Sequence, residues 1–299
     1  MPEGDTIHRA ASALRTALVG HPVHRFSAQR SVGPSPELGS VVETVRSHGK
    51  HLEVIFDDGI VLHTHMRMTG SWHLYRSGER WRRPEHQVRA LIEVPEWSAV
   101  CFNAPIVETY RMRDPRRHPG HGSLGPDLCD PVADLAECLR RLESYPHPDT
   151  SVAEVLLDQR VLCGVGNVYR CEVLWACGLS PFAPLSDLTR VDLAELIEVS
   201  ARLLRANLHR VERITIDTHP GGLAVYGRHH QRCPRCGGTV AVRRWGEHAR
   251  LLYWCPDCQV RHEPLSVRAA TPVEGLPRPI DQMYLDDLPW RHAARRRPR

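Results

Sequence analysis

The sequence predicts an α+β protein of several domains: a β-rich N-terminal domain with a leading helix, a helical domain, and a small cysteine-rich hairpin. Three patterns predict this order. Apolar residues alternate between positions 52 and 102, they recur at helical spacing between 152 and 208, and four cysteines stand in two close pairs after position 232. With 299 residues, of which 41% are hydrophobic, the chain is long enough to form more than one buried core.

The first predicted element is an amphipathic helix close to the N-terminus. Its apolar residues follow the i, i+3, i+4, i+7 spacing that places side chains on one helix face. These residues are Ile7, Ala10, Ala11, Leu14 and Leu18. Gly20 follows them and is expected to end the helix.

Strand patterns follow this helix. Alternating or continuous apolar runs predict strands at 52–56, 60–66, 88–94 and 99–102. Asp57-Asp58-Gly59 joins the first two as a hairpin turn. The segment 114–131 is rich in proline and glycine, which predicts a linker.

Helical patterns replace strand patterns after residue 131. Ser151 and Glu154 have the spacing of a capping box that opens one helix. A second helix follows the glycine-containing turn at 163–167, and a third spans 189–208. We place the β-rich domain at 1–130, the helical domain at 131–228 and the cysteine-rich hairpin at 229–262, followed by a tail at 263–299. The tail is proline-rich and basic, and we expect it to be disordered.

Composition narrows the function without naming it. A net charge of +4 and a pI near 8.6 permit nucleic-acid binding but do not require it. No apolar run is long enough to cross a membrane, and the N-terminus lacks the features of a secretory signal. We therefore expect a soluble, cytosolic protein. Cysteines that stand singly are then expected to be buried, reduced thiols, namely Cys101, Cys129, Cys138, Cys163, Cys171 and Cys177.

The two cysteine pairs are the most specific local motif. Cys233 and Cys236 form one C-x2-C pair, and Cys255 and Cys258 form another after eighteen intervening residues. This spacing predicts a tetrahedral zinc site of four thiolates, which is structural because no position stays open for water. A redox-active dithiol pair and a disulfide-linked hairpin are the alternatives. The hairpin between the pairs carries arginines suited to contact with a polyanion: Arg243, Arg244 and Arg250.

The turn Gly164-Val165-Gly166-Asn167 lies directly before a predicted helix. Backbone N–H groups at such a glycine-containing turn can approach a phosphate closely, and the helix dipole favours the anion. Asn167 would add an amide donor. The alternative is an ordinary turn between two helices, with Asn167 as the N-cap.

Lysine occurs only once in the chain. Of 39 basic residues, all but Lys50 are arginine. Unlike arginine, lysine can lose its proton and act in catalysis, so a single retained lysine is a candidate for such chemistry. The alternative is chance retention at a surface position.

The N-terminus offers a nucleophile. If Met1 is removed, Pro2 becomes a terminal secondary amine, and an α-amino group has a pKa of roughly 8. A neutral secondary amine can attack a sugar C1′ and form an iminium ion, and the adjacent Glu3 could move protons. The alternative is that proline and glutamate simply suit the first turn of a helix.

Together these motifs resemble the formamidopyrimidine-DNA glycosylase/endonuclease VIII family of base-excision repair enzymes. The matching motifs are Pro2-Glu3-Gly4, Gly49-Lys50, the segment 164–169, and the cysteine pairs with Arg250, in the family's order over residues 2–262. The N-terminal Pro-Glu-Gly, the stretch 65–72 and the Trp-Cys-Pro at 254–256 are more similar to the endonuclease VIII branch. The resemblance implies an N-terminal β-sandwich, a helix–two-turn–helix domain and a zinc-finger β-hairpin.

The resemblance also implies a role for each matching residue. Pro2 is the nucleophile that attacks C1′ and displaces the damaged base, and Glu3 assists as proton donor at the sugar. Lys50 contacts phosphate and supports β-elimination. Arg250 holds the phosphate beside the lesion and assists δ-elimination, and Asn167 binds a backbone phosphate.

The loop 67–70 resembles the family's void-filling loop, which occupies the space left by a nucleotide turned out of the duplex. Met68 is the candidate wedge, and Arg67 stands where the endonuclease VIII branch has glutamine. The alternative for Met68 is a core methionine.

The chain departs from the family pattern at two further places. The family usually has a second glutamate at position 6, where this chain has Thr6 after Asp5. An arginine that precedes the Gly-Pro-Asp motif in the endonuclease VIII branch corresponds to Ser123. Nearby basic residues that could replace it are Arg116, Arg117 and His121.

The sequence therefore predicts a bifunctional DNA glycosylase and AP lyase that acts on oxidised bases, with pyrimidines favoured, and cleaves the strand by β,δ-elimination. We expect a cytoplasmic, nucleoid-associated monomer that binds damaged double-stranded DNA, one structural zinc ion and no nucleotide cofactor. The alternatives are a glycosylase of the 8-oxoguanine or formamidopyrimidine type, a non-catalytic zinc-containing binder of damaged or single-stranded DNA, and a zinc-ribbon transcription factor.

Overall fold

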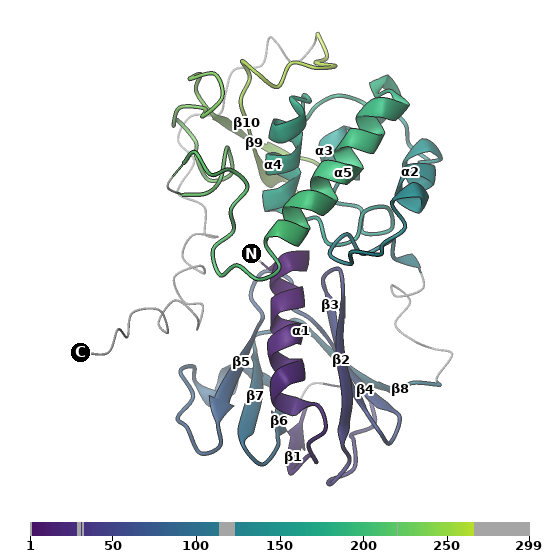
Figure 1. The fold of residues 1–299 in the computed structure, drawn as a ribbon, viewed down its shortest axis with the longest axis vertical. Coiled ribbons are helices and arrows are strands. Elements are labelled where there is room, and N and C mark those ends of the chain that lie inside the picture. Colours follow the sequence, from purple (N-terminus) through teal and green to yellow (C-terminus); the bar gives the residue numbers. More distant parts are fainter. Residues whose placement is uncertain (1, 29–30, 32, 114–122, 220, 266–299) are drawn as a thin grey trace, which may run out of the picture. The chain divides into compact units, whose positions relative to one another are not determined.

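The computed structural model describes residues 2–28, 31, 33–113, 123–219 and 221–265. Two compact units divide the chain between Ser123 and Leu124, and each is described by itself. Among the described residues, a leading helix and the strands of two sheets come first, then helices, then a two-stranded hairpin (Figure 1). This order confirms the α+β class that the sequence predicts.

Helix α1 (Gly4–Leu18) opens the first unit. It buries the apolar face that its sequence spacing predicts, and Ile7, Leu14 and Leu18 are at most 1% exposed. The helix ends two residues before Gly20, as expected.

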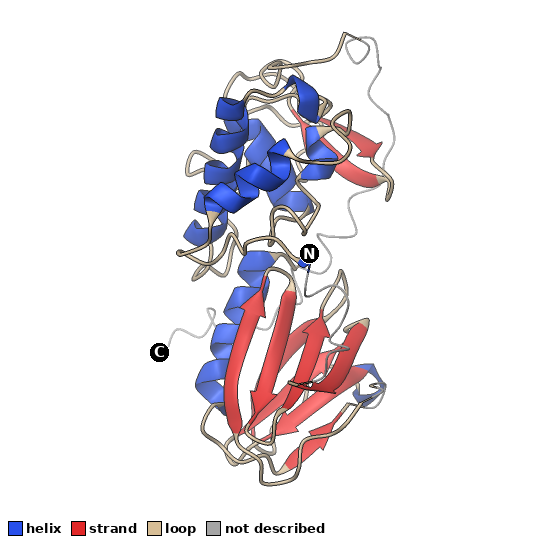
Figure 2. Ribbon diagram, turned by 90° about the vertical axis from the view of Figure 1, so that its right-hand side faces the viewer, coloured by secondary structure: helices blue, strands red, loops and turns tan. Residues whose placement is uncertain are grey.

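The strands of the first unit form two antiparallel four-stranded sheets, in the orders β1-β6-β7-β5 and β2-β3-β4-β8 (Figure 2). Their bounds are β1 (Arg25–Ser27), β2 (Val42–His48), β3 (His51–Phe56), β4 (Ile60–His65), β5 (Ser71–Arg76), β6 (Val88–Glu93), β7 (Trp97–Phe102) and β8 (Ile106–Arg111). A short 3-10 helix, η1 (Glu85–Gln87), precedes β6. Apolar residues of both sheets and of α1 share one core. The implied β-sandwich is therefore confirmed.

The predicted strands correspond to β3, β4, β6 and β7, and the expected tight turn at 57–59 joins β3 to β4. The sequence reading missed β1, β2, β5 and β8. In β2 the register with β3 shifts between Val42 and Thr44. Such an irregularity breaks the period-two alternation, which explains why this strand has no clear sequence signal.

Helix α1 packs lengthwise against β2 and runs antiparallel to it (Figure 1). At the C-terminal end of the helix, the Gly20 N–H donates to the Val42 carbonyl at 2.9 Å. One turn earlier in the helix, Nε and Nη2 of Arg15 donate to the Val45 carbonyl at 2.9 and 2.6 Å. The beginning of α1 therefore lies toward the end of β2, which is where the chain turns into β3.

The second unit is helical and closes with a hairpin. Its elements are α2 (Leu135–Glu143), α3 (Val152–Val155), α4 (Asn167–Cys177), η3 (Leu185–Asp187), α5 (Arg190–Ala206), β9 (Ala241–Trp245) and β10 (Arg250–Trp254). One apolar core includes side chains of the helices and of the hairpin. The hairpin is therefore an integral part of this unit. The helical domain and the hairpin implied by the resemblance are both present.

Three details of the second unit differ from the sequence reading. Helix α2 was not predicted. Ser151 does precede a helix, but α3 has only one turn, and the Ser151 hydroxyl donates to the Glu154 carboxylate instead of capping backbone N–H groups. The last part of the expected linker packs into the core: its residues Leu128 and Cys129 are at most 1% exposed.

The six cysteines that stand singly are all buried, as expected: Cys101, Cys129, Cys138, Cys163, Cys171 and Cys177. Within the described part of the chain, no helix combines the length and apolarity needed to cross a membrane. The predicted tail at 263–299 lies outside the described residues, apart from 263–265, and so do the candidates Arg116, Arg117 and His121.

A buried histidine of β5 makes the first unit sensitive to pH. His73 is 3% exposed, and its ring nitrogens contact the hydroxyls of Ser71 and Tyr75 at 2.9 and 3.1 Å. Burial, with the nearby charges of Arg83 and Arg82, lowers the pKa of His73 from 6.5 to about 4. The folded protein therefore holds this ring neutral where an unfolded chain would protonate it.

We predict that His73 makes folding less favourable as the pH falls from about 6.5 toward 4, because only the unfolded chain takes up this proton over that range. The contribution of His73 is fully present above pH 6.5 and falls by up to about 2 kcal/mol by pH 5.0. His73→Gln should therefore lose less unfolding free energy than the parent chain between pH 7.5 and 5.0, measured by urea denaturation. An equal loss in both proteins would contradict this assignment.

Candidate functional site

The N-terminal segment lies just outside α1. Glu3 is the N-cap residue, and its carbonyl accepts the first helical N–H groups, from Thr6 at 2.9 Å and Ile7 at 3.0 Å. The Glu3 side chain makes no capping hydrogen bond and is fully buried. Pro2 precedes the N-cap and is half-buried. Pro2 therefore lies outside the helix and not in its first turn, whereas Glu3 does lie at the positive end of the helix, where a carboxylate is favourable.

Lys50 occupies the two-residue turn between β2 and β3 and is half-buried. Its neighbour Gly49 has a φ of 55°, a left-handed conformation that glycine adopts without strain. The antiparallel packing of α1 on β2 brings this turn to the same end of the first unit as the N-terminal segment. From Arg15 the helix leads back to Gly4, and from Val45 the strand leads on to the turn at Gly49 and Lys50.

The loop 66–70 follows β4 at this same end of the first unit. It is tight, because the Gly70 N–H donates to the Met66 carbonyl at 2.8 Å and a Cβ at Gly70 would lie 2.8 Å from the Met66 Cα. The Thr69 hydroxyl anchors the loop to the Asn103 carbonyl at 3.0 Å. Arg67 is exposed, and Met68 is 51% exposed. The alternative that Met68 is a core methionine is therefore wrong.

The departure at position 6 has a local structural explanation. Asp5 is fully buried in the first turn of α1, where it accepts the Thr6 N–H at 2.7 Å and lies 3.1 Å from the Thr6 hydroxyl. Its second oxygen forms an ion pair with Arg9 at 3.5 Å. A carboxylate is favourable near a helix N-terminus, and here Asp5 supplies it.

Asn167 is the first residue of α4, while Gly166 is the N-cap. The alternative that Asn167 is an N-cap is therefore wrong. Its side chain is 4% exposed, donates through Nδ2 to the Leu251 carbonyl at 2.8 Å and accepts a hydrogen bond from Arg170. Arg170, which is fully buried, also contacts the Leu251 carbonyl, at 3.3 Å. The start of α4 therefore holds the hairpin strand β10.

Arg250 is the first residue of β10 and pairs with Trp245 of β9. It is half-buried and directly precedes Leu251, the residue that α4 holds. The other two arginines of the hairpin have different surroundings. Arg243 lies over the rings of Phe182 and Trp245, at 5.3 and 4.9 Å from the centroids, whereas Arg244 is exposed. Arg243 is therefore used in packing.

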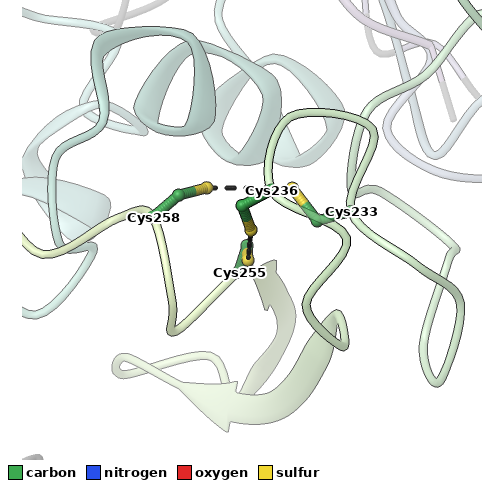
Figure 3. Close-up of side chains that lie close together, drawn as sticks. All are labelled: Cys233, Cys236, Cys255 and Cys258. Atoms are coloured by element: carbon green, nitrogen blue, oxygen red, sulfur yellow. Dashed lines mark hydrogen bonds between the residues drawn. The ribbon is translucent and has the colours of Figure 1, made fainter.

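The four predicted metal-binding cysteines come together as expected, with their side chains pointing toward one another (Figure 3). Their sulfur atoms all lie within 4.8 Å of one another. The Sγ atoms of Cys233 and Cys258 are 3.7 Å apart, and those of Cys236 and Cys255 are 3.4 Å apart. A tetrahedral thiolate site with metal–sulfur bonds of about 2.3 Å needs sulfurs about 3.8 Å apart, so the cluster can hold one such ion.

The surroundings of Cys233 favour its thiolate, since they lower the pKa of this thiol. The indole Nε1–H of Trp175 donates to Cys233 Sγ at 3.3 Å, and such donors around a metal site orient its ligands. The guanidinium of Arg235 lies 4.1 Å from the Trp175 ring centroid, which keeps a positive charge close to the cluster.

Glu172 is a buried residue that the sequence reading missed. It is 1% exposed, and its carboxylate accepts the backbone N–H groups of Ala224, Val225 and Tyr226 at 2.8 to 2.9 Å. The Thr215 hydroxyl also donates to it. One carboxylate of α4 thus organises the segment 215–226, whose described residues, 215–219 and 221–226, lie in no helix or strand. A single buried glutamate within an apolar helix is the only sequence signal of this role.

We predict that Glu172→Gln destabilises this segment. The carboxylate now accepts hydrogen bonds from three backbone N–H groups, and the NH2 of a glutamine side chain would face one or more of these donors instead of accepting from them. The expected cost is about 2 kcal/mol, typical of buried donors that lose their acceptor. Urea denaturation should show the loss, and limited proteolysis should cut within 215–226 earlier than in the parent chain. Glu198→Gln, at an exposed position of α5, is the matched control and should change neither measurement. Unchanged protection in Glu172→Gln would refute this role.

The predicted site residues fall into two groups. Pro2, Glu3, Lys50 and the loop with Arg67 and Met68 gather at one end of the first unit. Asn167, Arg250 and the four cysteines belong to the second unit, where α4 and β10 connect them.

Comparison with known proteins agrees with this division. Residues 1–118 match the formamidopyrimidine-DNA glycosylase N-terminal domain, and residues 124–218 match the formamidopyrimidine-DNA glycosylase H2TH domain. "Probable endonuclease 8 2" of Streptomyces coelicolor is 37% identical over 88% of this chain and 96% of its own length. "DNA-(apurinic or apyrimidinic site) lyase Nei2" of Mycolicibacterium smegmatis is 36% identical over 87% of this chain and 99% of its own length.

Solved structures share the fold at lower sequence identity. Lactococcus lactis Fpg in complex with DNA that contains an abasic site has a TM-score of 0.71 and 19% identity, covering 87% of this chain and all of its own. MutM in complex with DNA containing carbocyclic 8-oxo-G has a TM-score of 0.73 and 18% identity.

The chain therefore belongs to the formamidopyrimidine-DNA glycosylase family. Within this family it is an enzyme of the endonuclease VIII type, a DNA glycosylase and apurinic/apyrimidinic-site lyase of base-excision repair. The resemblance drawn from four sequence motifs, including the branch, is confirmed.

Proposed function

We propose that this enzyme removes oxidised bases from double-stranded DNA, pyrimidines in preference to 8-oxoguanine, through a Schiff base on Pro2, and that it then cleaves the strand by β,δ-elimination. The observation that carries this proposal is the placement of the N-terminal segment. Pro2 stands outside α1 with the buried Glu3 carboxylate beside it, at the same end of the first unit as Lys50. A sole lysine beside an amine and a carboxylate suits chemistry at a sugar carbon.

The first step uses the amine of Pro2 after loss of Met1. Its lone pair attacks C1′ as the bond to the damaged base breaks, and the base leaves with the bonding electrons and takes up the proton that the proline nitrogen loses. Glu3, in its protonated form, supplies a proton to the ring oxygen of the sugar. The ring then opens to give an iminium ion on the proline nitrogen. A secondary amine with a pKa of roughly 8 has a useful neutral fraction at pH 7.

Strand cleavage follows from the iminium ion. Loss of a C2′ proton breaks the C3′–O bond in β-elimination, and the phosphate leaves with the electron pair. Lys50 binds the phosphate and supports this step. Arg250 binds the phosphate beside the lesion and assists the δ-elimination that breaks the C5′–O bond. Asn167 binds a further phosphate through the second hydrogen of its amide, since the first is donated to Leu251.

Access to C1′ requires the nucleotide to leave the stack, at a cost of a few kcal/mol. Met68 fills the vacated space, and Arg67 contacts the DNA beside it. Both are exposed on the tight loop after β4, which suits insertion into a duplex. The enzyme acts as a monomer in this scheme.

Zinc is the metal that the four cysteines hold in this proposal. Four thiolates at tetrahedral spacing suit Zn²⁺, and they leave no open position, so the ion is structural and contributes to the folding of the hairpin.

We predict that borohydride traps a covalent adduct between Pro2 and a duplex that contains an abasic site. Peptide mapping of the adduct should place it on the N-terminal peptide, and intact mass should show loss of Met1. The same chain with an N-terminal extension is the matched control, and it should bind the duplex without being trapped, because its proline nitrogen is an amide. An adduct on Lys50, or equal trapping of the extended chain, would refute the mechanism.

The same assay separates the alternatives for function. Duplexes that carry thymine glycol or 8-oxoguanine should both be tested, and the oxidised pyrimidine should be excised faster. Faster excision of 8-oxoguanine would favour the alternative specificity. Salt-dependent binding with no strand scission would favour a non-catalytic DNA binder.

We predict that Arg250→Ala keeps its zinc but loses at least about 90% of lesion cleavage, since removing a charge-assisted phosphate contact costs about 1.5 to 3 kcal/mol. Zinc content should be measured by mass spectrometry of the intact metalloprotein, and cleavage on a thymine glycol duplex. Arg244→Ala is the matched control on the same hairpin, where the exposed side chain donates to the Ala249 carbonyl at 3.2 Å, and it should cleave at close to the parent rate. Unchanged cleavage in Arg250→Ala would remove this arginine from the mechanism.

A further inference from the structure

The outward face of the sheet β2-β3-β4-β8 carries a group of histidines beside Lys50. Successive residues of a strand point to opposite faces. In β3 and β4, the residues that alternate with the core side chains Leu52, Val54 and Leu62 are therefore on the outward face. They include His51 and His63.

His51, His63 and Glu108 form a continuous chain across three strands. The Nδ1 of His51 lies 2.9 Å from the Nε2 of His63, and their rings are stacked with centroids 5.2 Å apart. The Nδ1 of His63 lies 3.4 Å from the Glu108 carboxylate. His63 is fully buried, so the central ring of this chain is removed from water.

The carboxylate fixes one end of this hydrogen-bond chain. A carboxylate only accepts, so Nδ1 of His63 carries the hydrogen and donates to Glu108. When both rings are neutral, the Nε2 of His63 accepts and the His51 Nδ1–H donates to it. A further proton is shared by the two coupled rings, and the nearby Glu108 charge favours it.

Other charged and titratable groups on this face are Arg46 and His48 of β2, Glu53 of β3, His65 of β4 and Tyr110 of β8. Arg46 forms an ion pair with Glu53 at 2.5 Å, and the Tyr110 hydroxyl also donates to Glu53. The charge of Glu53 is therefore largely balanced by Arg46. Glu108 is the carboxylate that contacts His63.

The chain ends where the two DNA-facing loops of the proposed function begin. His51 directly follows Lys50, and it pairs across the sheet with His65. The His65 ring meets His51 edge to face, with centroids 4.7 Å apart, and its Nδ1 accepts the Arg67 N–H at 3.2 Å. His51 thus lies between the Lys50 turn and the loop with Arg67.

We propose that His51 is a further phosphate-binding residue of this enzyme, which binds DNA as an imidazolium whose proton Glu108 stabilises through His63. This inference rests on the proposed function, because it needs a DNA phosphate to reach the end of the first unit that carries Lys50. His63 and Glu108 are positioning residues in this arrangement, since they act through His51.

The direction of the pH dependence follows from linkage. A phosphate binds the charged ring better than the neutral ring, so the complex retains a proton that the unbound protein can lose. Affinity for DNA should therefore rise as the pH falls. At low pH the ring also displaces one more counterion from the DNA, which steepens the salt dependence by about one phosphate contact.

The test measures the Kd of the full chain for a duplex with a tetrahydrofuran abasic analogue, which cannot form a Schiff base, between pH 8.0 and 6.0. The parent chain should gain roughly tenfold more affinity over this range than His63→Leu, about the strength of one charge-assisted contact. Glu108→Gln gives the same test if His63→Leu folds poorly. This carboxylate is 41% exposed, and the variant should lose the same gain in affinity. Parent-like gains in both variants would overturn the inference.

Two further variants separate this role from packing. His63→Gln can still donate to Glu108 and accept from His51, so it should restore most of the pH-dependent gain that His63→Leu loses. His73→Gln replaces an equally buried histidine of the other sheet and should keep the parent's gain. A loss in His63→Gln as large as in His63→Leu would indicate a merely structural role and contradict the relay.

Borohydride trapping of each variant distinguishes a failure of the proposed function from a failure of the role proposed for His51. If the parent chain is not trapped at Pro2, the proposed function fails. If the parent is trapped but its DNA affinity does not depend on His63 or Glu108, only the role of His51 fails.

Discussion

The antiparallel packing of α1 on β2 is the contact on which the site of the first unit depends. Arg15 and Gly20 fix the helix against the start of β2 through the Val45 and Val42 carbonyls. From these contacts the helix leads back, and the strand leads on, to the same end of the first unit. The N-terminal segment is thereby held at the end that carries the Lys50 turn. In the proposed mechanism this positioning lowers the entropy that the nucleophile must lose before it reacts.

In the second unit, α4 has the corresponding role. Its first residue, Asn167, and the buried Arg170 hold the Leu251 carbonyl of the hairpin, and Glu172 holds the segment 215–226 on another side. Buried polar groups are costly without partners, so the hydrogen bonds that Asn167 and Glu172 make also make the arrangement specific. The fixed hairpin determines where Arg250 stands. The metal cluster closes the end of the same hairpin.

The two sheets of the first unit hold their histidines differently. His73 contacts hydroxyl groups and lies near arginines, so burial keeps it neutral and lowers its pKa to about 4. His63 instead contacts a carboxylate and a second imidazole. A buried ring with a carboxylate partner can support a positive charge nearby, whereas one among hydroxyls and cations cannot. Residue type is therefore a weak guide to the protonation of a buried histidine.

The sequence by itself determined the fold class, the helix at 4–18, the β3–β4 hairpin and the cysteine pairs, because periodicity and ligand spacing are local properties of the chain. Motifs in register also identified the family. Only the tertiary structure placed Pro2 outside its helix, turned the Asn167 amide toward Leu251 and connected Glu108 to His51 through His63. These contacts join residues as many as 84 positions apart in the sequence. They depend on strand register, packing and burial, and a local sequence pattern encodes none of these.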